Sequence, residues 1–240
     1  MSASTLHPPV LKHHFDNLHQ QHASERLGMW MFLATEVMFF AGLFAAYTVY
    51  RMWYPDDFEF AGSLLLWKIA AINTFLLITS SLTMTLAIRC AQSGDRKGLI
   101  RNLLITAALG TAFMGFKTYE YLTDFEEKLL PTQAFYESHA AHDLETKVNP
   151  ERARLGLEAI SSERVRLFLC FYYVMTGIHS IHLVVGIGCV LWLAWEAWRG
   201  TIPPDNYSTV DVVSLYWHLV DAIWLFLMPL LYLAGAGMGH

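Results

Sequence analysis

Five apolar stretches run along this 240-residue chain, and polar stretches separate them. Each is long enough, as a helix, to cross a hydrocarbon core of about 30 Å, which takes about 20 residues. A backbone that faces lipid must satisfy its hydrogen bonds within its own segment, so we expect every stretch to be helical. The predicted fold is an all-α, polytopic membrane bundle of five transmembrane helices. The spans lie near residues 27–50, 65–90, 99–122, 166–195 and 212–234.

The polar stretches are predicted to be an arm and four loops. Residues 1–26 form a polar arm that carries five histidines, which we interpret as irregular and solvated, and residues 27–240 form the transmembrane domain. The longest loop, at 123–165, is rich in charge. The other loops are expected at 54–57, 89–101 and 200–211.

Composition supports a lipid environment. Apolar residues make up 55% of the chain and charged residues only 15%, whereas soluble domains carry about 25% charged residues. The net charge of −5 is small and acidic, so we exclude nucleic acid as a partner. Cys90, Cys170 and Cys189 lack the spacings of a zinc site or a disulfide framework, and we interpret them as packing residues.

Basic residues in the short loops predict the orientation, because Lys and Arg favour the cytoplasmic side of a membrane. The loop before the third span contains Arg89, Arg96, Lys97 and Arg101, whereas the first loop is acidic. We therefore expect a cytoplasmic N-terminus. An odd number of spans then places the C-terminus and the long charged loop on the outer side.

Ionisable side chains inside the spans are the strongest functional candidates, because each costs about 2.5–3.5 kcal/mol to insert. Glu36 lies in the first span, His179 and His182 in the fourth, and His218 and Asp221 in the fifth. At 1.5 Å per residue, all five lie about 8–14 Å from the cytoplasmic edge. We predict that they converge into one buried cluster, in which Glu36 and Asp221 accept hydrogen bonds from imidazole donors.

Alternatives stay open for these residues. Glu36 has either a structural role in helix packing or a role in lipid contact or proton traffic. His179 and His182 are an alternative metal or haem pair, but two residues on one helix do not supply a haem with ligands from facing helices, so we predict no metal site.

Other polar and aromatic residues in the spans are interpreted as structural. Lys117 and Glu120 lie about 27 Å along the third span, at the outer interface, where Lys117 can extend to water. The remaining candidates, expected to bond or pack between helices, are Asn73, Ser80, Ser81, Trp217 and Trp224.

Five motifs, one on each span, resemble the cytochrome c oxidase subunit III family in content, order and placement. The similarity covers about residues 25–235, and the two most specific motifs are TGIHSIH at 176–182 and YWHLVDAIW at 216–224. The other motifs are LGMW at 27–30 with Glu36 and the phenylalanines at 39 and 40, Asn73-Thr74 with Ser80-Ser81, and Tyr119-Glu120-Tyr121.

The resemblance implies a non-catalytic core subunit, without haem or metal of its own, in a haem-copper terminal oxidase of a bacterial inner (plasma) membrane. Subunit I, which holds haem and copper, is the implied direct partner, and subunit II and a small subunit IV are further partners. Bound phospholipid, guidance of oxygen toward subunit I and support of proton uptake are also implied. Glu36 falls on the glutamate for which the family's carbodiimide reactivity is known.

The chain departs from longer family members in two places. It resembles their helices three to seven, so the helix pair that forms one wall of the family's lipid-holding cleft is absent. Lys117 stands where many members have a glutamine, and the loop at 123–165 is unusually long. We interpret this loop as a docking surface for another respiratory complex or a cytochrome domain.

Other functions are alternatives to a cytochrome c oxidase subunit. The motifs do not identify the electron donor, so a subunit of a quinol oxidase or of a nitric oxide reductase fits them too. A membrane cytochrome b is a different class, and it needs histidines paired across helices to hold haem. An ion-coupled transporter is disfavoured because the helices are continuous and no internal repeat is evident.

Overall fold

The computed structural model describes residues 18–200, 202 and 207–233. Within them, five helices are long and apolar enough to cross a membrane, which confirms the predicted fold class. The first helix begins at Leu18, so the end of the predicted polar arm is helical, and residues 1–17 with three of its histidines lie outside the described residues. The long helices are α1 (Leu18–Trp53), α3 (Trp67–Gln92), α4 (Arg96–Glu126), α7 (Ser162–Arg199) and α8 (Ser208–Tyr232).

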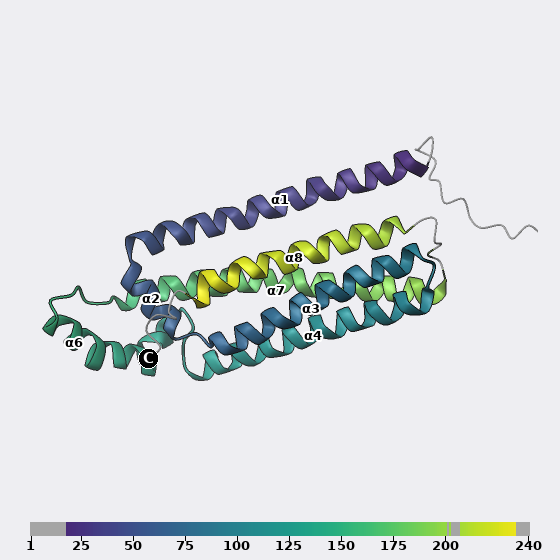
Figure 1. The fold of residues 1–240 in the computed structure, drawn as a ribbon. Coiled ribbons are helices and arrows are strands. Elements are labelled where there is room, and N and C mark those ends of the chain that lie inside the picture. Colours follow the sequence, from purple (N-terminus) through teal and green to yellow (C-terminus); the bar gives the residue numbers. More distant parts are fainter. Residues whose placement is uncertain (1–17, 201, 203–206, 234–240) are drawn as a thin grey trace, which may run out of the picture.

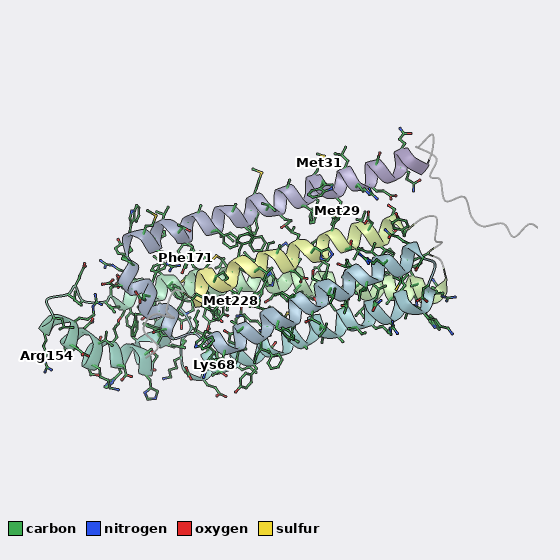
Figure 2. The ribbon with its side chains drawn as sticks, viewed as in Figure 1. Met29, Met31, Lys68, Arg154, Phe171 and Met228 are labelled. Carbon is green, nitrogen blue, oxygen red and sulfur yellow. The ribbon has the colours of Figure 1, made fainter. Side chains whose placement is uncertain are left out.

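The long helices lie alongside one another in a single bundle (Figure 1). Helices α7 and α8 occupy its middle, α3 and α4 pair along one side, and α1 lies along the other. Helix α1 is the least embedded of the five long helices. Only 11% of its apolar membrane-spanning stretch is buried inside the bundle, compared with 50% for α8. Figure 2 shows Met31 on the outer side of α1 and Met29 on the side toward α8. Most of α1 is therefore free to face lipid or another protein.

Helix ends are fixed by local chemistry. Asp95 caps α4 by accepting a hydrogen bond from the backbone N–H of Gly98 at 3.0 Å. Helix α7 ends at Gly200, whose φ of +80° lies in the left-handed region that favours glycine. Arg96 then donates from Nε to the carbonyl of Ala197 at 2.7 Å, which satisfies one of the acceptors left open at that helix end. The start of α4 is thus bound to the end of α7.

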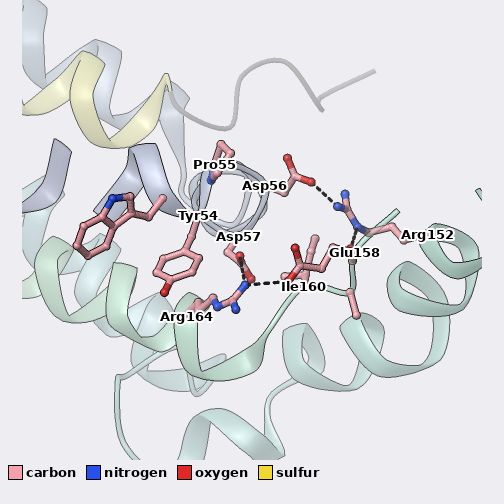
Figure 3. Close-up of a pocket in the computed structure, with 10 residues that line it drawn as sticks. Tyr54, Pro55, Asp56, Asp57, Arg152, Glu158, Ile160 and Arg164 are labelled. Carbon is pink, nitrogen blue, oxygen red and sulfur yellow. Dashed lines mark hydrogen bonds and ion pairs between the residues drawn. The ribbon is translucent and has the colours of Figure 1, made fainter. Parts of the chain in front are cut away.

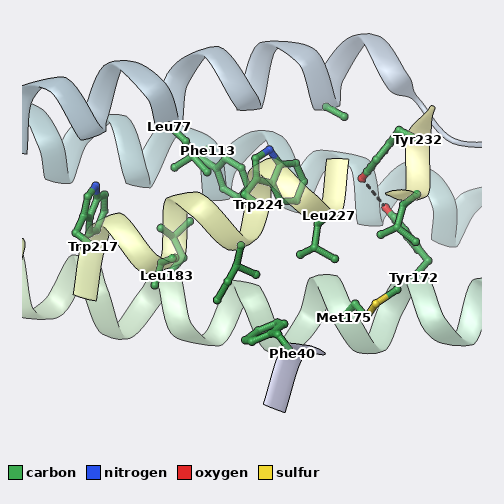
Figure 4. Packing of buried hydrophobic residues seen from close by; sticks show 14 of the residues in the cluster. Phe40, Leu77, Phe113, Tyr172, Met175, Leu183, Trp217, Trp224, Leu227 and Tyr232 are labelled. Atoms are coloured by element: carbon green, nitrogen blue, oxygen red, sulfur yellow. Dashed lines mark hydrogen bonds between the residues drawn. The ribbon is translucent and has the colours of Figure 1, made fainter. Parts of the chain in front are cut away.

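Aromatic rings fill the interior between α4, α7 and α8 (Figure 4). Phe113 meets Trp224 edge-on, with ring centroids 4.8 Å apart. The Trp217 ring lies against two helix backbones, because a Cβ at Gly110 would come within 2.8 Å of it and a Cβ at Gly186 within 3.2 Å. The two glycines let the three helices approach around one large side chain.

The indole N–H group of each interior tryptophan is also hydrogen-bonded. Nε1 of Trp217 donates to Oγ of Ser80 at 3.2 Å, and Nε1 of Trp224 donates to Oγ1 of Thr74 at 3.1 Å. Each bond joins α8 to α3, so the polar stripe of α3 supplies acceptors to the aromatic core.

Short helices occupy much of the loops predicted at 54–57 and 123–165, and α3 and α4 extend into the loop predicted at 89–101, which shortens it to 93–95. Pro55 at the first helical position and acidic residues in the first turn favour α2 (Pro55–Ser63). Further along, short helices gather at the same end of the bundle (Figure 1). We call residues 127–161 the outer cap, because they lie at the end of the bundle that is predicted to face outward. Its helices are η1 (Gln133–Glu137), α5 (His139–Asp143), the π-helical η2 (Leu144–Val148) and α6 (Asn149–Arg154).

Candidate functional site

The five ionisable residues predicted to converge occupy three separate places. Glu36 meets His182 between α1 and α7, His218 and Asp221 line a groove between α3 and α8, and His179 lies in the aromatic interior. The prediction of one cluster is therefore wrong, although Glu36 does meet an imidazole, that of His182. It rested on equal depth along the helices, and depth does not determine which face of a helix carries a side chain.

Glu36 and His182 form the polar contact between α1 and α7. Oε2 of Glu36 lies 2.9 Å from Nε2 of His182, and Nδ1 of His182 lies 2.9 Å from the carbonyl oxygen of Ile178. A carbonyl only accepts, so Nδ1 carries a hydrogen. The other contact then joins either a protonated Glu36 to a neutral imidazole or an imidazolium to a carboxylate. In both cases one proton lies between the two side chains.

The surroundings hold this pair in place but leave it partly open. The hydroxyl of Tyr216 donates to the backbone carbonyl of His182 at 3.0 Å, and the Phe40 ring meets the imidazole edge-on at 5.6 Å. The side chains of Glu36 and His182 are 19% and 21% exposed. The pair is thus reachable from the α1 flank, where a lipid or another subunit can approach.

His218 and Asp221 line a groove of about 350 Å³ between α3 and α8. Nδ1 of His218 lies 2.8 Å from the Ser81 hydroxyl, so Ser81 bonds across the helix interface. Asp221 is only 5% exposed, and neither of its carboxylate oxygens has a hydrogen-bond partner among the described residues. The groove therefore contains a polar group that the described part of the chain does not satisfy.

His179 is fully buried among aromatic rings. Its ring centroid lies 5.3 Å from that of Trp224 and 5.9 Å from that of Phe113. Within the described part of the chain, neither of its ring nitrogens has a hydrogen-bond partner, and the amide of buried Asn73 also lacks one. Because His179 and His182 have different neighbours, they do not form a shared ligand pair.

Lys117 is the centre of a network that sequence reasoning missed. Its side chain is 1% exposed, so the expectation that it extends to water is wrong. The ammonium donates to Oε2 of Glu120 at 2.9 Å, to the Tyr172 hydroxyl at 3.0 Å and to the Tyr232 hydroxyl at 2.6 Å. Its three donors are all used. The network joins α4, α7 and α8.

The acids of this network are satisfied as well. Oε1 of Glu120 accepts from the Tyr232 hydroxyl at 2.8 Å, and Asp124 accepts from the Tyr173 hydroxyl at 3.1 Å. The sequence did carry a signal, because Lys117, Glu120 and Asp124 are spaced at i, i+3 and i+7 and therefore share one face of α4. A face with three ionisable groups has to meet protein rather than lipid.

Aromatic faces complete the enclosure of the Lys117 ammonium. It lies 4.7–5.5 Å from the ring centroids of Tyr121, Tyr172, Trp224 and Tyr232. Cation–π attraction offsets part of the cost of removing the charge from water. With every donor bonded, the network has a structural rather than a ligand-binding geometry.

A second polar cluster attaches the outer cap to α2 (Figure 3). Asp57 accepts from the backbone N–H of Ser161 at 2.7 Å and from Arg164 at 3.3 Å. Arg152 bonds Asp56 through its guanidinium, and these residues border a pocket of about 180 Å³. The ion pair and hydrogen bonds that border this pocket therefore hold the outer cap against the end of the bundle.

Comparison with known proteins finds one family. The family described as Cytochrome c oxidase subunit III matches residues 11–126 and 160–236, which include all five long helices. The unmatched segment, 127–159, contains the short helices of the outer cap.

Individual relatives span nearly the whole chain. Cytochrome c oxidase subunit 3 of Thermostichus vulcanus is 30% identical over 223 residues, which cover 91% of each chain. Quinol oxidase subunit 3 of Bacillus subtilis (strain 168) is 28% identical over 216 residues, covering 88% of this chain and 87% of the relative. Cytochrome c oxidase subunit 3 of Synechocystis sp. is 29% identical over 225 residues, covering 90% of this chain and 78% of the relative.

Proposed function

This chain belongs to the cytochrome c oxidase subunit III family, and we propose that it is a non-catalytic core subunit of a haem-copper terminal oxidase. The observation that carries the proposal is the family match along all five long helices. Family membership makes the chain part of a haem-copper oxidase complex. Subunit I is the proposed direct partner, and subunit II and a small subunit IV are further proposed neighbours.

Haem and copper are assigned to the partner subunits. His179, His182 and His218 each have a different set of neighbours, and none of them faces another histidine across helices within the described residues. In this proposal the chain stabilises subunit I, binds phospholipid and supports oxygen access and proton uptake. The exposed flank of α1 supports a lipid or protein contact, and the proton shared by Glu36 and His182 lies beside that flank.

The proposed location is a bacterial inner membrane, with the N-terminus in the cytoplasm and the C-terminus in the periplasm. The basic residues at the adjoining ends of α3 and α4 support this orientation, because Lys and Arg at the ends of spans joined by a short loop favour the cytoplasmic side. The outer cap then lies on the periplasmic side.

Cytochrome c is the proposed electron donor, and quinol is the alternative. The alternative has specific support, because relatives of both kinds are about equally similar to this chain, at 30% and 28% identity. An affinity tag on the chain and mild detergent extraction of native membranes test both points. We expect co-purification with a haem- and copper-containing subunit, and oxidation of reduced cytochrome c by the assembly.

Each outcome of that purification is informative. Oxidation of quinol but not cytochrome c selects the alternative donor. A tagged chain that purifies without any haem-copper subunit contradicts the proposed function. A haem band that stays with this chain after the other subunits are removed identifies a cytochrome b instead.

The outer cap is proposed as a docking surface for another respiratory complex. Its support is that residues 127–159 fall outside the family match and are held on one end of the bundle by ion pairs of Arg152 with Asp56 and of Glu158 with Arg164. Replacing these residues with a short Gly-Ser linker should leave the oxidase assembled and active but remove its co-migration with a second complex on native gels. Unchanged co-migration counts against this role.

A further inference from the structure

The groove between α3 and α8 is incomplete within the described part of the chain. Asp221 lines the groove, and only 5% of the residue is exposed. Neither of its carboxylate oxygens has a hydrogen-bond partner among the described residues. The Ser81 hydroxyl is its polar neighbour, and this hydroxyl also bonds Nδ1 of His218 at 2.8 Å. A hydroxyl has one hydrogen to donate and a carboxylate has two acceptor oxygens, so Ser81 alone cannot satisfy Asp221. Buried polar groups in proteins are nearly always hydrogen-bonded, so the groove indicates a missing partner.

The depth of the groove restricts what that partner is. Asp221 is the fourteenth of the 25 residues of α8, about 20 Å from its start, and Ser81 is at the same distance along α3. Both lie near the middle of a hydrocarbon core of about 30 Å, so phospholipid headgroups are about 15 Å away. Of a phospholipid, only the acyl chains reach this depth, and they carry no donor.

The walls of the groove fit an apolar helix. Ile78, Leu82 and Leu225 line its rim and are 52%, 59% and 45% exposed. Ala222, next to Asp221, has a small side chain that leaves space at the base of the groove. Apolar walls by themselves fit acyl chains as well as a helix, but acyl chains cannot bond the carboxylate that lies between these walls. The walls and the carboxylate together match the way transmembrane helices associate, by close packing around small residues and by interhelical hydrogen bonds.

We infer that the groove receives a transmembrane helix of another subunit of the oxidase, and that a hydrogen-bond donor on that helix binds Asp221. The inference rests on the proposed function, because it takes the partner from the same complex. Suitable donors are a hydroxyl, an amide or indole N–H, or a basic side chain. Asp221 is thus a positioning residue for assembly.

The test uses the tagged oxidase in native membranes. A photoreactive cross-linker is attached to Leu82→Cys at the groove rim, and to Ile181→Cys, a 65% exposed position at the middle of α7, as the matched control. We expect the Leu82 probe to label one identified subunit of the purified complex. Asp221→Leu should reduce this product about three- to thirtyfold, since interhelical hydrogen bonds have that effect on association. Asp221→Asn should retain it, because its amide oxygen still accepts.

Labelling from Ile181 should stay the same in both Asp221 variants, which shows that the chain is still folded and inserted. If Asp221→Leu does not accumulate, Ala222→Phe fills the groove and should remove the Leu82 product without changing Asp221. Leu82 products with lipid or quinone alone, or a subunit product that persists in Asp221→Leu, overturn the inference. A chain that purifies without a haem-copper subunit overturns the proposed function instead.

Discussion

Two regions of this bundle bury ionisable groups in opposite ways. At one end, Lys117 is surrounded by Glu120, Tyr172 and Tyr232, and each of its donors has an acceptor within the chain. At mid-depth, Asp221 is almost as deeply buried but has no hydrogen-bond partner among the described residues. Both arrangements cost desolvation energy. Only in the first do hydrogen bonds within the chain offset that cost.

The difference separates internal structure from assembly. A network that is complete within α4, α7 and α8 holds the fold together in any surroundings. A buried carboxylate without a full set of donors is costly in lipid, and a donor from outside the chain would lower that cost. The pair formed by Glu36 and His182 is intermediate, because it is bonded internally and still about one-fifth exposed.

Lys117→Met is expected to have the largest effect on stability. It leaves Glu120 and Asp124 buried without their cation, and breaking a buried ion pair costs about 3–5 kcal/mol. We expect a marked decrease in the temperature at which the tagged subunit aggregates in the solubilised oxidase. Lys97→Met is the control, because Lys97 is exposed on the same helix. Equal aggregation temperatures for the two variants would show that the network is not stabilising.

Gly110→Ala should have the next largest effect, because it forces apart the helices that the Lys117 network joins. The added Cβ would come within 2.8 Å of the Trp217 ring, and overpacking of this kind costs about 1–3 kcal/mol. Gly115→Ala lies on the same helix with no atom within 4 Å of its Cβ, so it should leave the aggregation temperature unchanged. A similar decrease in both variants contradicts the close approach at Trp217.

Glu36 variants test the intermediate case. Glu36→Leu removes the partner of His182 and should cost about 1–3 kcal/mol, whereas Glu36→Gln can still bond the imidazole and should cost less. Both should keep the haem content of the oxidase and lose carbodiimide labelling at this position. Loss of haem signal in either variant would contradict a non-catalytic role.

The smallest effect is expected in the outer cap, where ion pairs are exposed. A hydrogen bond from Lys147 holds the pKa of Asp143 below its usual value, so the pair's contribution is present near neutral pH and lost as the pH falls through that lowered pKa. Solvent screening makes this contribution minor. Lys147→Met should therefore not change the aggregation temperature measurably at pH 7 or pH 3. A clear decrease in the aggregation temperature at pH 7 but not at pH 3 would show that this ion pair stabilises the outer cap more than its exposure indicates.

The sequence alone determined the number, type and approximate bounds of the long helices. Twenty apolar residues in lipid have few alternatives to a helix, so hydropathy is sufficient evidence. The motifs on those helices, such as the one ending at His182, also predicted the family. The short helices of the outer cap were missed because they have no long periodic pattern.

Tertiary structure decided which polar residues meet. The sequence placed Glu36, His179, His182, His218 and Asp221 at one depth, but the rotation of each helix about its axis follows from packing against its neighbours. Trp217 between Gly110 and Gly186 shows how specific that packing is. It brings Glu36 to His182, leaves Asp221 at a groove and buries Lys117 where water was expected. Helix rotation depends on contacts between distant segments, and hydropathy along one segment does not contain that information.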